Sequence, residues 1–205
     1  MEQKQARDLA VTAQRARLLA LDMVHTAGSG HIGGSLSVMD LLTTLYFHQM
    51  RIDPKAPQDP SRDRLVLSKG HCTPALYSVL ALRGYFPVEE CRLFRSIRGH
   101  FSGHPDMNHV PGVDMSTGSL GQGISAAVGM ALAGRVDRAD YCVYAILGDG
   151  EVEEGQVLSL IHIYYIHHAK ILTCQHKEKK NVACPNGLQH IFYSITLRVS
   201  LQKWT

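Results

Sequence analysis

The stretch Tyr141-Cys-Val-Tyr-Ala-Ile-Leu147, followed at once by Gly148-Asp149-Gly150-Glu151, decides the fold. Its apolar run predicts a buried strand, and the glycine-rich turn after it predicts a loop at the strand's carboxyl end. A carboxylate in this position can ligate Mg²⁺, and flanking glycines let the backbone approach phosphate oxygens without a side-chain clash. Asp149 could instead cap a helix. Because the turn directly follows a strand, we favour a site for a metal-bound diphosphate.

Upstream of this strand the sequence predicts two helices joined by a glycine-rich loop. Apolar residues recur at helical spacing over residues 6–25, which indicates an amphipathic helix. The loop 28–34 is too rich in glycine to be regular structure. Ser37 followed by Asp40 forms a variant of the capping box, which predicts that a second helix begins there.

The middle of the chain alternates strand, loop and helix. Residues 64–68 are a candidate buried strand, and a helix is expected over 74–83. Residues 98–119, rich in Gly, Pro, His and Asp, are long for a plain connection and indicate a binding loop. Residues 120–133 predict a helix with small residues on one face. The alternation predicts an α/β fold with a mainly parallel sheet.

Composition sets limits on the kind of protein. The 205 residues are 45% hydrophobic and 19% charged, as expected for one globular domain. Residues 1–157 carry 15 Lys and Arg against 17 Asp and Glu, whereas residues 158–205 carry six against one. The basic tail lacks the periodic basic and aromatic residues of a nucleic-acid surface, so no nucleic-acid partner is expected. The N-terminus lacks an apolar targeting segment, and no stretch is long enough to cross a bilayer. Five cysteines without a CxxC pair fit a reducing cytoplasm.

Three glycine-histidine turns carry candidate chemistry. They are Ser29-Gly30-His31, Lys69-Gly70-His71 and Gly103-His104-Pro105-Asp106. Each histidine follows the end of an element, where a side chain can reach into a cleft, although a single loop histidine is more often a plain surface residue. Together, on one side of a sheet, they indicate a site. Residues 117–123 are as rich in glycine as a phosphate loop but lack the nucleotide and dinucleotide signatures, which disfavours ATP and NAD.

Three acids follow the Gly-Asp-Gly turn. For Glu151 and Glu153 we prefer the simple interpretation that acids are favoured in the first turn of a helix. Only Glu154 gains a role, through the family resemblance that follows.

Five motifs in fixed order resemble transketolase, and the match covers about residues 8–157. The motifs are Ser29-Gly-His-Ile-Gly-Gly-Ser35, Asp63-Arg-Leu-Val-Leu-Ser-Lys-Gly-His71, Gly103-His-Pro-Asp106, Thr117-Gly-Ser-Leu-Gly-Gln-Gly123 and Gly148-Asp-Gly-Glu-Val-Glu-Glu-Gly155. The chain looks especially similar to the N-terminal subunit of split transketolases. This resemblance implies the thiamine diphosphate-binding fold, with helices on both faces of the sheet, here truncated.

The resemblance also implies a cofactor, a metal and a reaction. Asp149 would ligate Mg²⁺, Gly148 and Gly150 would contact thiamine diphosphate, and His71 would face its diphosphate or thiazolium. Gly118 and Leu120 would lie against the aminopyrimidine. The implied reaction transfers a two-carbon ketol unit from a ketose phosphate to an aldose phosphate.

Substrate and partner roles follow from the same resemblance. His31 and His104 would bind the ketose donor near its C1 hydroxyl and carbonyl, where charge develops as the C2–C3 bond breaks. Glu154 would reach a dimer interface and support the catalytic glutamate of a partner, the pyrimidine-binding subunit.

The resemblance ends near Val157. The family follows the Gly-Asp-Gly turn with a helix and then a strand ending in an Asn that completes the Mg²⁺ site. Residues 158–205 contain one of the 18 glycines, show no capped helix pattern, and include an apolar run over 160–166 that indicates a strand. We therefore divide the chain into an incomplete cofactor domain, 1–157, and an atypical tail, 158–205, that resembles frameshifted or foreign sequence.

Two alternatives stay open beside a transketolase subunit. One is an enzyme similar to 1-deoxyxylulose-5-phosphate synthase, which the motifs at 103–106 and 117–123 weaken. The other is a fragment that binds thiamine diphosphate without catalysis. For a transketolase subunit we expect no activity from the chain alone, because the resemblance implies that the catalytic glutamate comes from the pyrimidine-binding partner.

Overall fold

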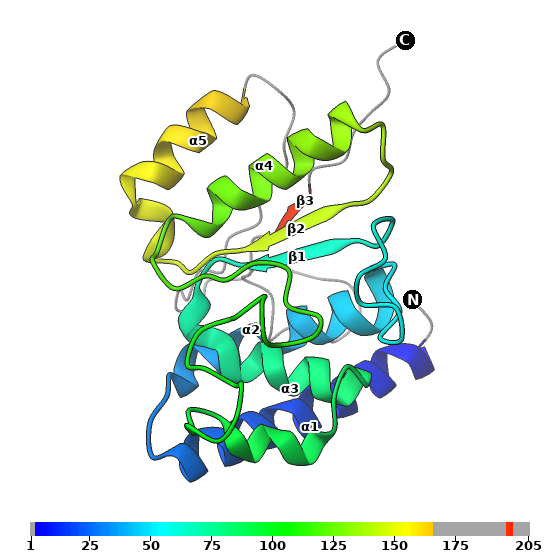
Figure 1. The fold of residues 1–205 in the computed structure, drawn as a ribbon, viewed down its shortest axis with the longest axis vertical. Helices are drawn as coiled ribbons and strands as arrows, with labels where there is room; N and C mark the ends of the chain where they lie inside the picture. Colours follow the sequence, from blue (N-terminus) through cyan, green and yellow to red (C-terminus); the bar gives the residue numbers. More distant parts are fainter. Residues whose placement is uncertain (1–2, 166–195, 199–205) are drawn as a thin grey trace.

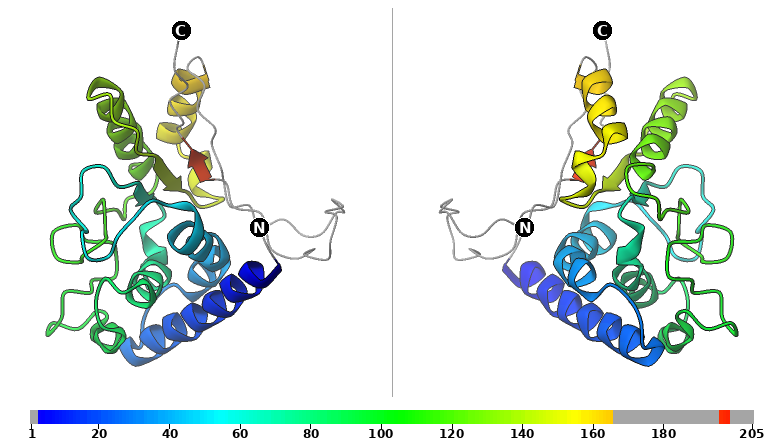
Figure 2. Two further views of the ribbon diagram at one scale, coloured as in Figure 1. Left: turned by 90° about the vertical axis from the view of Figure 1, so that its right-hand side faces the viewer. Right: turned by 90° about the vertical axis from the view of Figure 1, so that its left-hand side faces the viewer.

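The computed structural model describes residues 3–165 and 196–198 (Figure 1). Helices on both faces enclose a small sheet at the centre (Figures 1 and 2). The helices and strands are α1 (Gln3–Ala27), α2 (Ile32–Thr44), the π-helical turn η1 (Leu45–Gln49), β1 (Arg64–Leu67), η2 (Gly70–Cys72), α3 (Thr73–Arg83), η3 (Val88–Leu93), α4 (Gly123–Val136), β2 (Val143–Ile146), η4 (Glu151–Glu153), α5 (Gly155–Tyr165) and β3 (Thr196–Arg198). The α/β class is confirmed.

The sheet has the order β1-β2-β3. β1 and β2 run parallel, with Arg64 opposite Val143 and Leu67 opposite Ile146. β3 pairs antiparallel with β2. Since β1 and β2 are parallel, the loops that follow them leave the sheet at the same edge.

Alternate strand residues serve two separate cores, as the pleat of a strand requires. Leu65 and Leu67 face α1, α2 and α3, whereas Val66 between them faces α4. β2 alternates in the same way, with Ile146 in the first core and Ala145 in the second. Both faces of the sheet are therefore apolar, which explains the nearly unbroken apolar run at 141–147.

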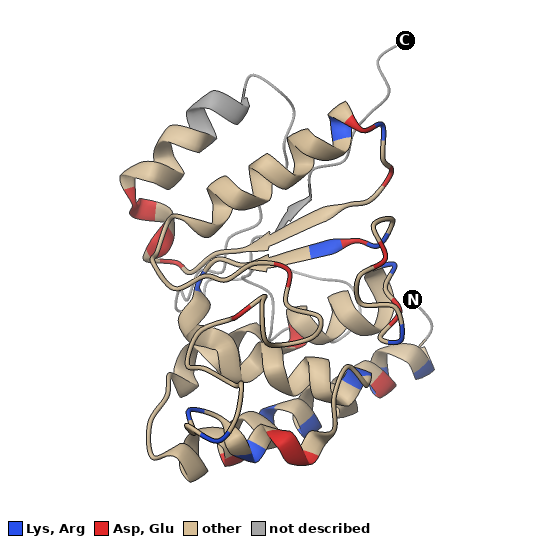
Figure 3. Ribbon diagram, in the orientation of Figure 1, with Lys and Arg blue, Asp and Glu red and all other residues tan. Residues whose placement is uncertain are grey.

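The long first helix matches its predicted pattern. α1 buries Ala13, Ala16, Ala20 and Met23, one stripe at helical spacing. Charged residues also occur along α1 (Figure 3), and Arg7, Arg15 and Asp22 among them are exposed. This helix extends three residues beyond the predicted start and two beyond the predicted end.

The predicted capping box at Ser37 is wrong. α2 begins five residues earlier, with His31 at the N-cap position, and Ser37 lies inside the helix, where its hydroxyl donates to the carbonyl of Gly34 at 2.9 Å. A Cβ at Gly34 would stand 2.7 Å from the Cys72 sulfur. Gly34 therefore serves close packing of the first turn of α2 against η2, whereas Gly28 and Gly30, which have positive φ, lie in the short connection before the helix.

The predicted helix over 120–133 begins at residue 123 instead. Gly121 has φ +79°, a left-handed conformation that keeps residues 120–122 in a turn. In α4 the only charged residue is Arg135, in the last turn, so the helix can pack along the sheet.

The prediction of no helix behind the Gly-Asp-Gly turn is wrong, as is the strand expected from residue 160. α5 covers residues 155–165 and lies beside α4 (Figure 1). Val157 is fully buried in the hydrophobic core between α4 and the sheet, and Leu160 packs against that core. Tertiary packing thus selects a helix where the apolar run alone fits a strand equally well. α5 crosses the proposed boundary at residue 157, and the division there stays a prediction.

No helix in the described part of the chain is long and apolar enough to cross a membrane. The cytoplasmic location stays a prediction. Most of the tail, residues 166–195 and 199–205, lies outside the described residues.

Candidate functional site

The candidate site begins where β1 and β2 end. Residues 68–71 follow β1 and residues 148–150 follow β2, at the same edge of the sheet. The amide of Ser68 donates to the carbonyl of Ile146 at 2.8 Å, which holds the two strand ends together. The sequence motifs Lys69-Gly-His71 and Gly148-Asp-Gly150 are therefore neighbours, as a ligand site at this edge of a parallel sheet requires.

The loop 117–123 closes against both strand ends. The Thr117 hydroxyl donates to the carbonyl of Leu67 at 2.6 Å. A Cβ at Gly70 would stand 2.8 Å from the amide nitrogen of Gly118. Gly70 thus has no room for a side chain, and the predicted aminopyrimidine contact Gly118 lies directly beside the Lys69-Gly-His71 turn.

The three predicted histidines come together over these loops. The rings of His31 and His71 meet edge to face, with centroids 5.2 Å apart. The His104 ring lies over Gly118, where a Cβ would stand 3.2 Å from Cδ2. His31 starts α2, His71 follows β1 and His104 lies in the long loop 98–119, so the fold assembles the cluster from three distant segments.

The backbone of His104 is held in place by neighbours that sequence reasoning missed. The hydroxyls of Tyr77 and Ser102 both donate to its carbonyl oxygen, Tyr77 at 3.1 Å. Arg95, just before this loop, donates from its amide to the carbonyl of Phe101 at 2.7 Å and from its guanidinium to the Ser29 hydroxyl at 2.8 Å, which joins the loop to the segment that carries His31. The long loop is therefore fixed by specific contacts.

Burial and neighbouring charge favour the uncharged forms of His71 and His104. Burial lowers the pKa of His71, and the nearby His31 and Lys69 lower it further. Burial also lowers the pKa of His104, with further lowering by Arg95 and His31. His71 and His104 are therefore neutral at neutral pH, and each can donate from one ring nitrogen and accept at the other.

These lowered pKa values predict that acid destabilises the chain. An unfolded histidine binds a proton near pH 6.5, but folded His71 binds one only at lower pH. Between the folded and the unfolded pKa of His71, the unfolded state binds more protons than the folded state. The free energy of unfolding therefore decreases as the pH falls below about 6.5. In a melting-temperature series from about pH 7.5 to 5.5, His71→Gln should flatten this loss and the exposed control His25→Gln should not. An unchanged slope in His71→Gln would contradict the assignment.

The predicted metal ligand Asp149 is exposed at the end of β2. Gly150 is also exposed, and a Cβ at Gly150 would meet no heavy atom within 4 Å. The described part of the chain has no group of three or more His, Cys, Asp or Glu side chains that could hold a metal. These residues thus offer one carboxylate, in open space that phosphate oxygens and water could fill.

Leu120 and Glu154 lie at the outer side of the loops. Leu120 is 39% exposed, and Glu154 is exposed, with its Cβ packed near Gly121. Their exposure places them where a second molecule could reach them.

Glu151 has a role that its sequence context does not reveal. It is only 2% exposed, and its carboxylate accepts hydrogen bonds from Ser68, Gly121 and Gly148. Glu151 lies in the first turn of η4, as expected, but its buried hydrogen bonds give it a further structural role that the expectation missed. Acidic residues following a Gly-Asp-Gly turn look alike in sequence, and only the packing of the loops distinguishes buried Glu151 from exposed Glu153.

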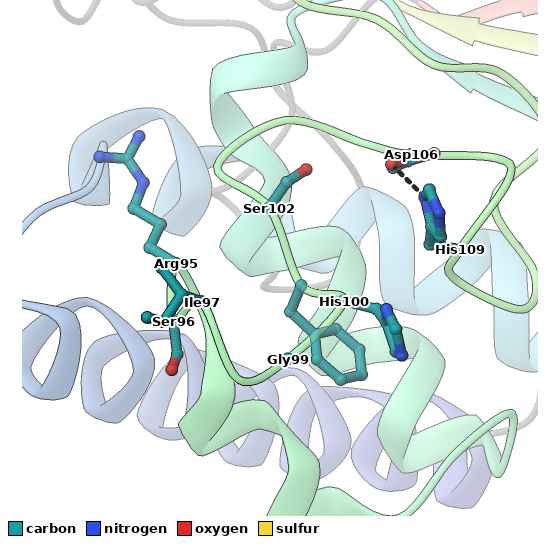
Figure 4. Close-up of a pocket in the computed structure, with 9 residues that line it drawn as sticks. Arg95, Ser96, Ile97, Gly99, His100, Ser102, Asp106 and His109 are labelled. Atoms are coloured by element: carbon teal, nitrogen blue, oxygen red, sulfur yellow. Dashed lines mark hydrogen bonds and ion pairs between the residues drawn. The ribbon is translucent and has the colours of Figure 1, made fainter.

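A pocket of about 470 Å³ lies on the outer side of the long loop (Figure 4). Its residues are Arg95, Ser96, Ile97, Gly99, His100, Phe101, Ser102, Asp106 and His109. His109 pairs with Asp106 at 2.7 Å and stacks on His100. The Arg95 guanidinium points away from these two histidines. His31, His71 and His104 do not line this pocket.

Comparison with protein-family models identifies the family of the chain. The family model described as "Transketolase, thiamine diphosphate binding domain" matches residues 8–168. The chain belongs to the transketolase family. The resemblance predicted from five motifs is thereby confirmed.

Among curated transketolases, two proteins named as subunits are similar. The chain is 52% identical over 150 residues to the 6-deoxy-6-sulfo-D-fructose transketolase subunit SqwG of Clostridium sp. (strain MSTE9), covering 73% of this chain and 54% of that one. It is 42% identical over 153 residues to an apulose-4-phosphate transketolase subunit of Phocaeicola vulgatus, covering 75% and 54%. The chain thus spans about half the length of these relatives.

Solved transketolase structures share the fold. The Campylobacter jejuni transketolase superposes with a TM-score of 0.72 at 36% identity, covering 78% of this chain and 26% of that one. The chain therefore corresponds to about a quarter of this longer transketolase.

Proposed function

We propose that this chain is the diphosphate-binding part of a transketolase. With thiamine diphosphate, Mg²⁺ and a pyrimidine-binding partner subunit, it transfers a two-carbon ketol unit from a ketose phosphate to an aldose phosphate. The observation that carries this proposal is the convergence of three histidines over the loops that follow β1 and β2. The similarity to two proteins named as transketolase subunits supports the need for a partner.

The described residues fit the diphosphate end of the cofactor. Asp149 offers an exposed carboxylate at a strand end, and Gly150 leaves open space beside it. Mg²⁺ usually takes one or two protein carboxylates and fills its other positions with phosphate oxygens and water. Asp149 would hold the metal, and Gly148 and Gly150 would let the backbone approach the diphosphate.

The histidines would act on the cofactor and the sugar. Thiamine diphosphate, when bound, supplies the nucleophilic carbon and the electron sink that let the C2–C3 bond of a ketose break. His31 and His104 would donate hydrogen bonds to the C1 hydroxyl and the carbonyl oxygen of the donor, where negative charge grows. His71 would face the diphosphate or thiazolium. Because His71 and His104 have lowered pKa values, neutral rings would perform these roles.

The partner would complete the other half of the site. Gly118 and the exposed Leu120 would lie against the aminopyrimidine, and Glu154 would reach the partner's catalytic glutamate across the interface. This arrangement needs a second chain because the catalytic glutamate belongs to the pyrimidine-binding part of the family.

The purified chain alone is therefore expected to show no turnover, and adding a pyrimidine-binding transketolase subunit should produce it. A coupled assay with a ketose phosphate donor, an aldose phosphate acceptor, thiamine diphosphate and Mg²⁺ measures turnover by the chain alone and by the mixture with the partner. Turnover by the chain alone would contradict the need for a partner.

The same assay distinguishes the two alternatives. Consumption of pyruvate as donor would support an enzyme similar to 1-deoxyxylulose-5-phosphate synthase. Cofactor binding without turnover, in a complex shown to form with the partner, would support a non-catalytic binding protein.

A further inference from the structure

Glu151 joins the three loops of the candidate cofactor site. Its Oε1 accepts hydrogen bonds from the Ser68 hydroxyl at 2.5 Å and the Gly121 amide at 2.9 Å. Its Oε2 accepts from the Gly148 amide at 2.9 Å. The donors come from the ends of β1 and β2 and from the loop before α4. One side chain therefore links all three segments.

The environment of this carboxylate requires these contacts. Glu151 is 2% exposed, and within residues 3–160 no Lys, Arg or His lies within ion-pair distance of it. A buried carboxylate is costly unless hydrogen bonds compensate for lost water. The three donors supply these hydrogen bonds. Two of the donors are the backbone amides of Gly148, at the end of β2, and Gly121, in the turn before α4, and both would lack an acceptor without Glu151.

Each donor stands next to a residue with a proposed cofactor role. Gly148 precedes Asp149, Gly121 follows Leu120, and Ser68 begins the segment that carries His71. A shift of the Glu151 carboxylate would move all three contacts with the cofactor at once. We propose that Glu151 is a positioning residue, which sets the spacing of the loops that hold thiamine diphosphate. This inference rests on the proposed function.

Glutamine cannot replace it. The amide of a Gln side chain has one oxygen acceptor and one NH₂ donor. In one orientation the NH₂ faces the Gly148 amide, and in the other it faces the Gly121 amide, so a donor always meets a donor. The Ser68 hydroxyl can turn to accept, but neither backbone amide can. Glu151→Gln is therefore a disruptive change despite its near-identical shape.

The first measurement is hydrogen exchange by mass spectrometry on the full chain without cofactor. Glu151→Gln should speed exchange in the peptide covering residues 117–123, remote in sequence from the change, and in the peptide covering 148–151. The control Glu153→Gln removes the same charge from an exposed neighbour and should leave exchange unchanged. Unchanged exchange in Glu151→Gln overturns the proposal.

The second measurement is calorimetric titration of Mg²⁺ and thiamine diphosphate into the complex with the pyrimidine-binding subunit. Glu151→Gln should raise the cofactor Kd by about tenfold or more, the effect of leaving a buried amide unpaired, and Glu153→Gln should not. Faster exchange with an unchanged Kd would mean a purely structural role and overturn the proposal. A wild-type complex that binds no cofactor would instead overturn the proposed function, and the positioning role with it.

A second variant keeps the test decisive if Glu151→Gln fails to fold. Ser68→Ala removes one donor and leaves the carboxylate with its two amides. It should change exchange over residues 117–123 and the cofactor Kd in the same directions, by smaller factors. No change in either quantity would overturn the proposal.

Discussion

Replacing His104 by alanine is expected to lower the turnover of the assembled transketolase by about 100-fold or more, the usual contribution of a positioned acid-base or charge-stabilising group. Cofactor affinity should stay nearly unchanged. His104 lies over Gly118 and near His31, on a segment separate from Gly148, Asp149 and Gly150. Steady-state kinetics with a ketose phosphate donor and calorimetry with Mg²⁺ and thiamine diphosphate measure the two quantities separately.

His109→Ala is the matched control. His109 is in the same long loop but pairs with Asp106 and lines the outer pocket. It should leave turnover nearly unchanged. Equal losses of turnover and cofactor affinity in His104→Ala would argue against a donor role for His104 and place it at the cofactor instead.

The sequence predicts the part of the fold that carries the candidate site well because its signals are local. The apolar run 141–147 and the glycines after it specify a strand end, and β2 lies there. Each of His31, His71 and His104 follows a glycine in a turn, which predicts side chains free to reach a cleft. The structure brings all three together, although their roles toward substrate and cofactor stay predictions.

The errors come from features decided by long-range packing. Ser37 has the spacing of a capping residue, but contact of Gly34 with Cys72 draws the start of α2 five residues back. The apolar run after Val157 fits strand or helix, and burial of Val157 against α4 selects the helix. No local pattern could predict these outcomes, because the deciding neighbours are distant in the sequence.

The buried role of Glu151 is the most informative feature that the sequence did not predict. Its three donors come from residues 68, 121 and 148, and two of them are far from it in the sequence. In sequence it differs little from Glu153, which is exposed. Buried backbone amides need hydrogen-bond acceptors, and the glycine-rich turns at 121 and 148 each present such an amide. A nearby acid that could accept from both is the signal that could have identified Glu151.

The metal site gives the second large expected effect. The described residues form no group of three or more His, Cys, Asp or Glu side chains that could hold a metal with Asp149, so the chain alone should bind Mg²⁺ and thiamine diphosphate poorly. Its melting temperature should scarcely rise when both are added. In the complex with a pyrimidine-binding subunit, ligand at about 100 times its Kd should stabilise a competent site by about 2.7 kcal/mol.

Thermal melts of the chain and of the complex, with and without ligand, measure this difference. Asp149→Ala should remove the stabilisation of the complex, whereas Glu153→Ala, which deletes an exposed acid in the following turn, should retain it. A clear upward shift in the chain alone that disappears in Asp149→Ala would show that residues outside the described part complete the metal site. The tail would then belong to a working cofactor domain, and its interpretation as foreign sequence would be wrong.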